Sequence, residues 1–408
     1  MHETRTKVKS KLARLGGTLY NTACMRSLFI TVIVGSVLGV LVFFAPPIAQ
    51  QQPRDKGSSY NSQRKIVRDP AGRIYVAYTK PARNFSQVFV QVSEDQGKTW
   101  RDLAHVSPPT GDATTPMLAI DSQQNLHVFW TQYVQNVRQI FYAPIEKGKA
   151  LPPQALTSGP AYNGFPAAAF DSKGRLHLVW YGLDEGVYQI WYRRKDKDDW
   201  SAPIKLSMGF PDSVNPTVAT DAEDNVHVAW YQFDSSRGVY QIFYRRYSAQ
   251  ADRWEQQRSL GRTETNALSP SLAVDASGRV HLVWEQQDEK NRFQIAYSSL
   301  TEREIAQVVW LTSGDVHATD PSIALDLQGR IYVFYAKGDG QIYLRRFDGV
   351  AWKPEERLTS QGHNEYPSAR WSFYHNPLLG INAKIDYIWT EELTDGKSQT
   401  RYGAIAIP

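Results

Sequence analysis

The chain is almost devoid of cysteine. Cys24 is its only cysteine in 408 residues, so no internal disulfide can form, and no group of cysteines and histidines has the spacing of zinc ligands. A disulfide-stapled scaffold and a structural zinc site are excluded, and we expect no metal and no cofactor. Helical periodicity is lacking too, because after residue 60 the apolar residues alternate in short runs instead of recurring every three or four positions.

The body of the chain also lacks an excess of either charge. The net charge is +5, but residues 1–26 hold six of the 46 basic and one of the 41 acidic residues, which leaves 40 of each in the remainder. A body without a basic surplus gives no support for nucleic-acid binding, and no nucleic-acid partner is expected.

Residues 27–44, SLFITVIVGSVLGVLVFF, form a run of 18 residues without a charge. This length suits the apolar core of a membrane, and the basic tail before it should stay in the cytoplasm. The sequence therefore predicts a basic cytoplasmic tail (1–26), a transmembrane signal-anchor (27–45), a linker (46–60) and a folded domain outside the cytoplasm (61–408). The alternative is a cleaved signal after Ala49 and a secreted protein.

The folded domain consists of internal repeats. A proline is followed by an aspartate five residues later at Pro116/Asp121, Pro166/Asp171, Pro216/Asp221, Pro270/Asp275 and Pro321/Asp326. An aromatic residue ends the next alternating stretch, in steps of 50 to 54 residues, at Tyr78, Trp130, Trp180, Trp230, Trp284, Tyr335 and Trp389. A further element then begins at Gln87, Gln139, Gln189, Gln241, Gln294, Gln341 and Gln399. Seven units result.

Each unit reads as three or four short strands separated by turns. Gly72, Gly174, Gly278 and Gly329 follow the turn aspartate by three residues, where a positive φ is expected. Two units lack this glycine, and there we expect the next residue, Asn125 or Asn225, to take that backbone conformation. Repeats of about 50 residues predict an all-β fold, a β-propeller with seven blades favoured over six. The last unit has no room for a fourth strand, which residues 58–63 are expected to supply.

One turn carries a full motif. Ser93, Asp95, Gly97, Thr99 and Trp100 match the S-x-D-x-G-x-T-W Asp box. With the repeats, this resembles the BNR/Asp-box propellers of the sialidase superfamily over about residues 60–408, and the resemblance implies a hairpin-stabilising role for the motif, without chemistry. The Arg-Ile-Pro of active sialidases is absent: alignment places Ser62 at its arginine, and Arg64 and Lys65 follow nearby. No catalytic residue of that superfamily can be assigned to a position in this sequence.

Departures from the repeat point to a ligand site. Three residues after the proline, five units have alanine, at Ala119, Ala169, Ala219, Ala273 and Ala324, which we attribute to crowding at the axis. The seventh unit has Arg370, expected to point into the central channel toward an anionic ligand or, alternatively, a structural carboxylate. Tyr181 and Tyr231 are placed to stack on a sugar, and Glu285 and Glu391 are acids on the same face.

The recurring histidines and the function complete these expectations. His127, His177, His227 and His281 share one position, which we assign to packing rather than metal binding. The leading function is non-catalytic recognition of a glycan or an envelope protein at the mouth of the channel. The alternatives are a divergent exo-acting glycoside hydrolase and a structural scaffold of an envelope complex.

The charge asymmetry around residues 27–44 predicts the topology. A reporter enzyme fused after Pro408 should be active only outside the cytoplasm, and the mature protein should keep its N-terminal tail. Activity assays and N-terminal sequencing measure both, and a soluble form that begins near Gln50 would contradict the anchor.

Overall fold

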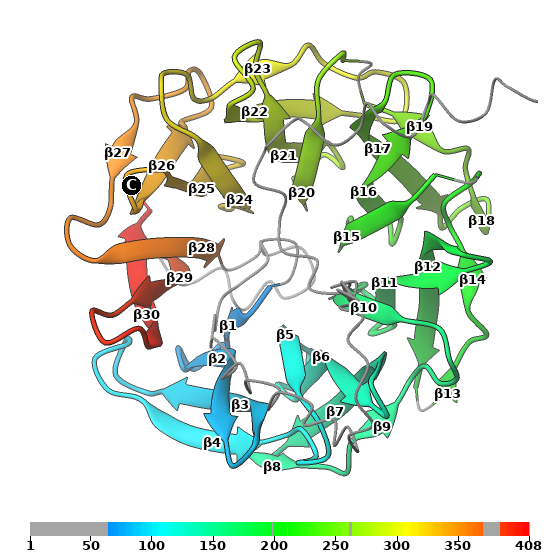
Figure 1. The fold of residues 1–408 in the computed structure, drawn as a ribbon, viewed down its shortest axis with the longest axis vertical. Coiled ribbons are helices and arrows are strands. Elements are labelled where there is room, and N and C mark those ends of the chain that lie inside the picture. The colour runs from blue at the N-terminus through cyan, green and yellow to red at the C-terminus, as the bar shows by residue number, and fades with distance from the viewer. Residues whose placement is uncertain (1–63, 198, 210, 261–262, 370–383, 408) are drawn as a thin grey trace, which may run out of the picture. The chain divides into compact units, whose positions relative to one another are not determined.

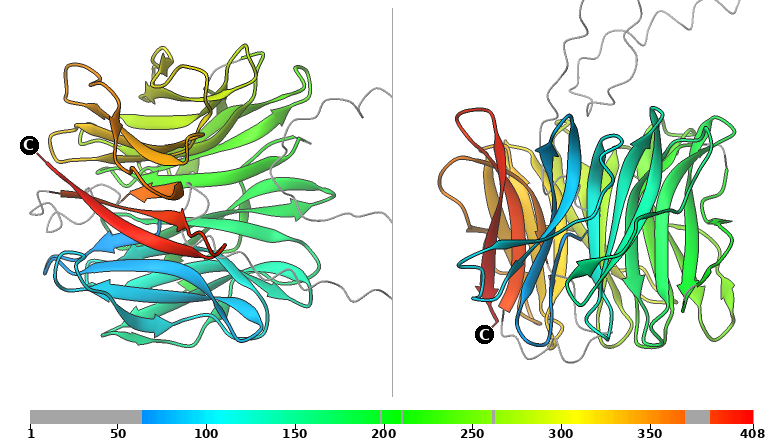
Figure 2. Two further views of the ribbon diagram at one scale, coloured as in Figure 1. Left: turned by 60° about the vertical axis from the view of Figure 1, so that its left-hand side comes forward. Right: turned by 90° about the horizontal axis from the view of Figure 1, so that it is seen from below.

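The fold is a ring of sheets. The computed structural model describes residues 64–197, 199–209, 211–260, 263–369 and 384–407. These residues form seven antiparallel sheets around a central axis (Figure 1), and the sheets stand side by side when the ring is seen from its edge (Figure 2). The predicted all-β propeller of seven blades is confirmed. The predicted segment 27–45 lies outside the described residues, among which no helix is long and apolar enough to span a membrane.

Each blade is built from consecutive strands, the first of which lies nearest the axis. The first strands are β1 (Ile66–Arg68), β5 (Ala113–Ile120), β10 (Asn163–Phe170), β15 (Ser213–Thr220), β20 (Ala267–Val274), β24 (Ala318–Leu325) and β28 (His363–Ala369). The second strands are β2 (Ile74–Ala82), β6 (Leu126–Val134), β11 (Leu176–Asp184), β16 (Val226–Asp234), β21 (Val280–Gln287), β25 (Ile331–Lys337) and β29 (Lys384–Glu392). The third strands are β3 (Phe85–Ser93), β7 (Val137–Glu146), β12 (Val187–Asp196), β17 (Val239–Ser248), β22 (Phe293–Leu300), β26 (Gln341–Phe347) and β30 (Ser398–Ala406).

Short strands complete the outer edge. They are β4 (Arg101–His105), β8 (Lys149–Ala150), β9 (Gln154–Ala155), β13 (Asp199–Trp200), β14 (Ile204–Lys205), β18 (Arg253–Trp254), β19 (Arg258–Ser259), β23 (Val309–Trp310) and β27 (Glu356–Arg357). In the described chain the seventh sheet has only three strands, β28–β29–β30, while residues 58–63 lie outside the described range. We call the face with the hairpins between second and third strands the mouth face, and the opposite face the turn face.

The repeated aspartate organises the turn between the first two strands. In the third blade, Asp171 Oδ1 accepts the backbone N–H groups of Lys173 and Arg175, and Gly174 has a φ of 75°. Where the glycine is replaced, the expectation for asparagine is wrong. Gln124 and Asp224 adopt the positive φ, at 68° and 65°. Asn125 and Asn225 instead donate their side-chain amides to the turn aspartates.

The recurring histidines connect the three long strands of a blade. His177 Nε2 lies 3.0 Å from Asp171 Oδ2, and its Nδ1 lies 2.8 Å from the hydroxyl of Tyr192 on the third strand. The same Asp–His–Tyr chain recurs at His127, His227 and His281. Each histidine is fixed within its own sheet, so the assignment to a structural role is confirmed.

The repeated glutamine holds the loop that enters the next blade. Six glutamines donate Nε2 to a carbonyl of that loop at 2.9–3.1 Å, from Gln87 to Gly111, Gln139 to Gly159, Gln189 to Gly209, Gln241 to Thr263, Gln294 to Val316 and Gln341 to Gly362. In each case Oε1 also accepts from a serine or threonine hydroxyl of the same loop. These buried glutamines satisfy polar backbone that the ring would otherwise bury at a cost.

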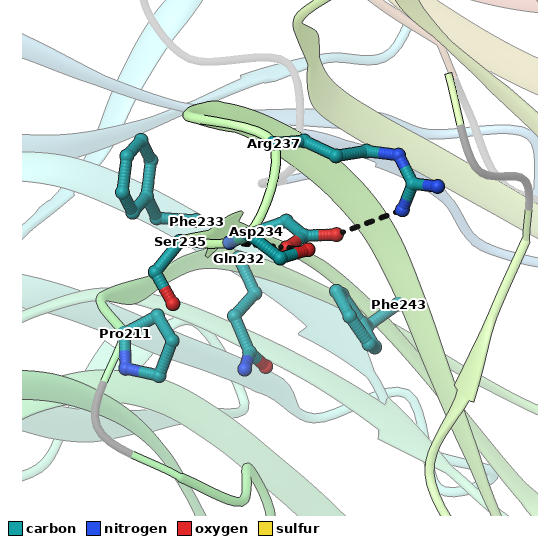
Figure 3. A pocket seen from close by; sticks show the side chains of 8 residues that line it. Pro211, Gln232, Phe233, Asp234, Ser235, Arg237 and Phe243 are labelled. Carbon is teal, nitrogen blue, oxygen red and sulfur yellow. Dashed lines mark hydrogen bonds and ion pairs between the residues drawn. The ribbon is translucent and has the colours of Figure 1, made fainter. Parts of the chain in front are cut away.

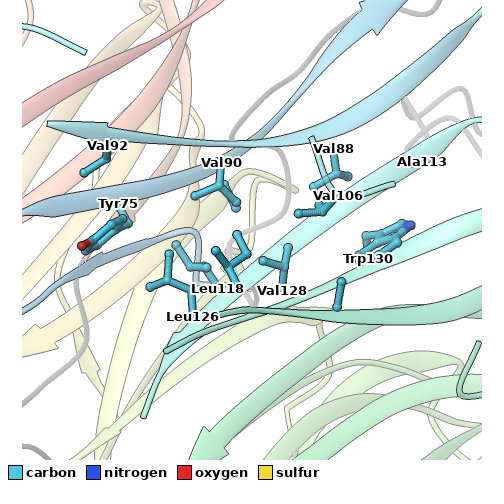
Figure 4. Packing of buried hydrophobic residues seen from close by; sticks show 13 residues of the cluster. Tyr75, Val88, Val90, Val92, Val106, Ala113, Leu118, Leu126, Val128 and Trp130 are labelled. Carbon is cyan, nitrogen blue, oxygen red and sulfur yellow. The ribbon is translucent and has the colours of Figure 1, made fainter. Parts of the chain in front are cut away.

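Apolar side chains fill the spaces between neighbouring blades. Figure 4 shows Val88 and Val90 of the first blade facing Leu118, Val128 and Trp130 of the second. The alanines three residues after the proline lie in cores of this kind rather than around the axis: Ala169, Ala219, Ala273 and Ala324 each pack in such a cluster. The close approach of adjacent sheets, not crowding in the channel, explains the small residue.

The ring closes through a buried ion pair between the first and last blades, which lie side by side in Figure 1. Arg68 Nε donates to Asp386 Oδ2 at 2.7 Å, Nη2 donates to Oδ1 at 2.5 Å, and both side chains are fully buried. Tyr402 donates its hydroxyl to Asp386 at 2.9 Å. The guanidinium also donates to Gln96 and to the carbonyl of Gly72.

The motif turn of the first blade packs on this junction. Asp95 accepts the amide and hydroxyl of Thr99, and Trp100 contacts Tyr402 edge-on with ring centroids 5.5 Å apart. A Cβ on Gly97 would lie 2.1 Å from the Tyr402 ring, so only glycine fits there. The motif therefore contributes to the contact between the two ends of the ring.

Arg68→Met tests the closure. Removing the guanidinium from a buried carboxylate should lower the free energy of unfolding by about 3 to 5 kcal/mol, because burial makes an uncompensated charge costly. Urea denaturation of the full chain measures the change. Arg101→Met, which breaks an exposed pair with Glu94 in the same blade, is the matched control and should leave stability nearly unchanged. Equal stability of the two variants would contradict a role for the buried pair.

Candidate functional site

Two sets of equivalent side chains meet at the mouth end of the inner strands. One set follows the strand-ending aromatic residues and comprises Thr79, Thr131, Tyr181, Tyr231, Glu285, Ala336 and Thr390. The other precedes the inner-strand prolines and comprises Thr115, Phe165, Asn215, Ser269, Asp320 and Tyr366. All six of the latter have φ between 49° and 57°, at a bulge in the strand. Such strained backbone in non-glycine residues marks places where side-chain direction matters.

Hydrogen bonds join the two sets within and between blades. The hydroxyls of Thr115 and Thr131 lie 2.8 Å apart, and Thr131 also accepts the amide of Phe165 from the next blade. In the same way, Glu285 Oε1 accepts the amide of Asp320 from the next blade at 2.8 Å. In these two cases the bulge residue thus donates its backbone amide to a side chain of the preceding blade.

Charged side chains gather at one part of this ring. Lys65, Glu285 and Asp320 are buried together with Arg64, and Glu285 has no exposed surface at all. The second carboxyl oxygen of Glu285, Oε2, has no hydrogen-bond partner among the described residues. Buried ionisable groups of this kind are costly and are concentrated at functional sites.

Burial shifts the proton affinities of this cluster. Burial, together with the charge of Asp320, raises the pKa of Glu285 to about 8, against the opposite effect of hydrogen bonds from the Asp320 amide and Ser269. Burial lowers the pKa of Lys65 to about 7 against the opposing attraction of Asp320. At neutral pH the carboxyl of Glu285 is protonated, so it can donate a proton or a hydrogen bond.

Arg64 crosses the channel. Its guanidinium donates to the carbonyls of Leu272 on β20 and Ile323 on β24, at 3.3 Å for Ile323, while its own carbonyl accepts the amide of Leu118 on β5. Figure 1 places β1, which follows Arg64, across the centre from β20 and β24. Burial lowers the pKa of Arg64 to about 9. The side chain therefore connects inner strands on opposite sides of the ring.

Three predicted site residues occupy equivalent positions in adjacent blades. Tyr181 is largely buried and contacts Phe165 and Tyr188, with ring centroids 5.1 Å apart in both cases. Tyr231 is half-buried and meets Tyr240 edge-on at 5.3 Å. Glu285 is the third member of this series and belongs to the charged cluster.

The other two predicted residues are not part of this series. Glu391 is one position further along its strand, so it points to the other side, where it accepts from Arg401 at 2.6 Å and Gln399 at 2.8 Å. Partial burial would raise its pKa, but these two donors lower it below the ordinary value. Arg370 lies outside the described residues.

A separate hollow of about 270 Å³ lies on the mouth face of the fourth blade. Figure 3 shows Pro211, Phe233 and Phe243 around it, and an ion pair between Asp234 and Arg237 at its rim. Asp234 also accepts from the hydroxyl and amide of Ser236, so the polar groups here largely satisfy one another. No group of three or more metal-binding side chains is found in the described ranges.

Comparison with known proteins identifies the fold and no closer relationship. No protein-family model matches the chain, and no curated protein matches it. Among solved structures, the chain is similar to a polysaccharide lyase of family PL25, an ulvan lyase bound to -[GlcA(1-4)Rha3S]-. The TM-score is 0.57 and the sequence identity 11%, and the match covers 86% of this chain and 94% of that one. Polysaccharide lyase Uly1 has a TM-score of 0.54, 9% identity and coverage of 86% and 91%.

A sialidase, the Hadza microbial sialidase Hz136, has a TM-score of 0.51, 15% identity and coverage of 79% of this chain and 73% of that one. The seven-bladed propeller is thus shared with enzymes that act on glycans. At these identities the likeness concerns the fold.

The sequence did not reveal Arg64, Lys65 and Asp320 as members of the cluster. Asp320 precedes Pro321, and the sequence does not predict the β-bulge that sets the direction of its side chain. Arg64 and Lys65 precede the first strand, where the sequence shows only that the Arg-Ile-Pro motif is absent. One signal was available: Arg64 stands where the six other units have the inner-strand proline.

The cluster predicts a pH dependence of stability. Glu285 ionises near 4.5 when unfolded and only near pH 8 when folded, so its contribution to stability is complete below pH 4.5 and is lost as the pH rises to 8. Lys65 acts in the opposite sense, losing its contribution as the pH falls from 10.5 to 7. Glu285→Gln removes only the first effect. Between pH 5 and 8, the wild type should therefore lose on the order of 1 kcal/mol per pH unit relative to this variant.

Urea unfolding at several pH values measures this slope. Glu391→Gln is the matched control: its pKa is lowered in the folded protein, so the carboxyl is ionised in both states above pH 6 and its replacement should add no slope from pH 6 to 8. Parallel stability profiles for wild type and Glu285→Gln would show that Glu285 is charged in the folded protein.

Proposed function

We propose that this protein recognises a glycan with the mouth face of its propeller, without cleaving it, and that residues 27–45 anchor it in the cytoplasmic membrane with the propeller outside the cytoplasm. One observation carries the proposal: half-buried tyrosines gather at the mouth ends of the second to fourth blades. They are Tyr133, Tyr162, Tyr188, Tyr231 and Tyr240, beside the more deeply buried Tyr181.

Tyrosines of this kind suit a sugar. The ring face packs on the C–H groups of a pyranose, and the hydroxyl makes hydrogen bonds that a purely apolar surface lacks. The edge-on pairs Tyr181–Tyr188 and Tyr231–Tyr240 hold these rings in fixed positions. Preorganised aromatic groups lose little entropy on binding. The glycan-active enzymes that share the fold lend further support.

The state of the carboxylates favours binding over cleavage. A catalytic acid has to reach the glycosidic oxygen, and Glu285 has no exposed surface. Four carboxylates nearer the mouth face are held in local ion pairs: Asp184 with Lys205, Asp234 with Arg237, Asp288 with Arg292 and Glu391 with Arg401. Paired carboxylates are poor candidates for general bases.

A divergent glycoside hydrolase is the second candidate, because Glu285 is protonated at neutral pH and has Asp320 beside it, as an acid with a neighbouring carboxyl would. A protein ligand or a scaffold role in an envelope complex is a further alternative.

A binding and turnover screen distinguishes these functions. The full chain in detergent micelles is applied to a glycan array and to a panel of chromogenic glycosides. We expect retention of at least one glycan and no turnover, and Tyr240→Leu should weaken retention at least about tenfold through loss of ring contacts. Phe347→Leu, at the turn-face end of the sixth blade, is the control and should bind as wild type.

Turnover that Glu285→Gln abolishes would replace recognition by hydrolysis. Absence of both retention and turnover would contradict a glycan function and favour the scaffold.

A further inference from the structure

The second blade carries a charge where the other blades have none. The residue before the repeated glutamine lies at the mouth end of each third strand. In six blades this residue is Ser86, Tyr188, Tyr240, Phe293, Gly340 or Ser398. In the second blade it is Arg138, which is half-buried.

A second departure lies opposite the first. In four blades the residue that precedes the next inner strand accepts the backbone N–H of this position at 2.7–3.1 Å: Asp112 from Ser86, Asp212 from Tyr188, Asn266 from Tyr240 and His317 from Phe293. The residue in that place opposite Arg138 is Tyr162. The place that aspartate holds in two of these cases, and asparagine or histidine in the other two, is therefore held by a tyrosine beside Arg138, and the two departures coincide in space.

Aromatic rings surround the guanidinium instead of carboxylates. Arg138 Cζ lies 5.7 Å from the ring centre of Tyr162 and 5.9 Å from that of Tyr181. Arg138 makes no ion pair within the described ranges, whereas Arg237 and Arg292, at the mouth-face hairpins of the fourth and fifth blades, are each paired with two acids. Arg83, at the hairpin of the first blade, is likewise unpaired in the described chain but is exposed to solvent. Part of the N–H edge is hydrogen-bonded to Tyr181, and a guanidinium stacked on aromatic faces can bind a planar, two-oxygen acceptor along the rest of this edge.

A buried glycine lies beside the guanidinium. Gly164, at the start of β10, has no side chain next to the pair: a Cβ there would lie 3.5 Å from the Tyr181 hydroxyl and 3.9 Å from Arg138 Cζ. A side chain at this position would contact both groups. Burial lowers the pKa of Arg138, whereas the neighbouring tyrosines, Tyr181 first, raise it above its ordinary value, so the guanidinium carries its charge and can receive an anion.

We propose that Arg138, Tyr162 and Tyr181 form a subsite for an anionic group of the glycan, a carboxylate or a sulfate. The subsite rests on the proposed glycan recognition and extends it, since it requires the ligand to be acidic. It lies between the second and third blades, apart from the buried cluster around Glu285. Because the contact is a partly exposed ion pair, its affinity falls as salt is added.

Small anions test the subsite separately from glycan recognition. D-glucuronate, glucose 6-sulfate and the neutral methyl glucoside are titrated into the full chain in detergent micelles, with affinity measured by calorimetry and melting temperature. We expect one or both anions to bind and the neutral sugar to bind more weakly. The stronger of the two anions identifies carboxylate or sulfate as the natural group.

Two substitutions remove the anion site by different routes. Arg138→Gln deletes the charge, and Tyr162→Asp introduces the acid that Asp112 and Asp212 provide at the equivalent place elsewhere in the ring, so that Arg138 is neutralised within the protein. Each should weaken anion binding at least about tenfold and leave methyl glucoside unaffected. Arg253→Gln, an exposed arginine at the outer edge of the fourth blade, has the same charge change and should bind as wild type. Tyr162→Asp also keeps the test decisive if Arg138→Gln fails to fold.

The outcomes separate the two proposals. Unchanged anion affinity in Arg138→Gln and Tyr162→Asp, or no anion binding by the wild type, overturns the subsite, and glycan retention on the array would then stand by itself. Anion binding that both substitutions abolish, together with a silent array, supports the subsite and contradicts the wider glycan function.

Discussion

A ring of repeated blades depends on the single junction that the repeat does not specify. Within the chain, each blade packs on the next through equivalent apolar residues, but the first and last blades meet only because the ring closes. Here the junction is a buried guanidinium–carboxylate pair, Arg68 with Asp386, with Tyr402 donating to the same carboxylate. A buried ion pair is sensitive to geometry, so it stabilises the ring only when the two blades meet in one register.

Closure also determines which surfaces are left for function. The turn face is occupied by Asp–His–Tyr chains and, near the junction, by the motif turn that packs on Tyr402. The mouth face carries the side chains that differ from blade to blade, and its strained bulges orient them. The repeated residues thus form a rigid frame, while the residues that differ between blades provide the polar and charged groups that could bind a ligand. This division is why residues that break the repeat were the best guide to a site.

Much of the fold was readable in the sequence because it follows from local rules. The spacing of proline and aspartate, the strand-ending aromatics and the repeated glutamine gave seven blades, and the structure supplies the hydrogen bonds that explain each. The prediction was wrong for the turns that lack glycine. The positive φ was expected at Asn125, but Gln124 adopts it, and Asn125 donates its side-chain amide to the turn aspartate. The contacts of Arg64 with Leu272 and Ile323 bridge more than 200 residues and arise only from closure, so no local pattern could predict them.

The same long-range contacts of Arg64 indicate which part of the ring is open to a ligand. Arg64 donates to the carbonyls of inner strands across the ring, and Lys65, Glu285 and Asp320 are buried as well, so these polar side chains belong to the interior of the described ring rather than to its surface. Buried charged groups of this kind either stabilise a rigid core or change their protonation state. Half-buried tyrosines and an arginine without a carboxylate partner in the described chain lie further out, between the second and fourth blades. A ligand gains most where polar groups are preorganised but incompletely satisfied, and this condition is met at the rim rather than on the axis.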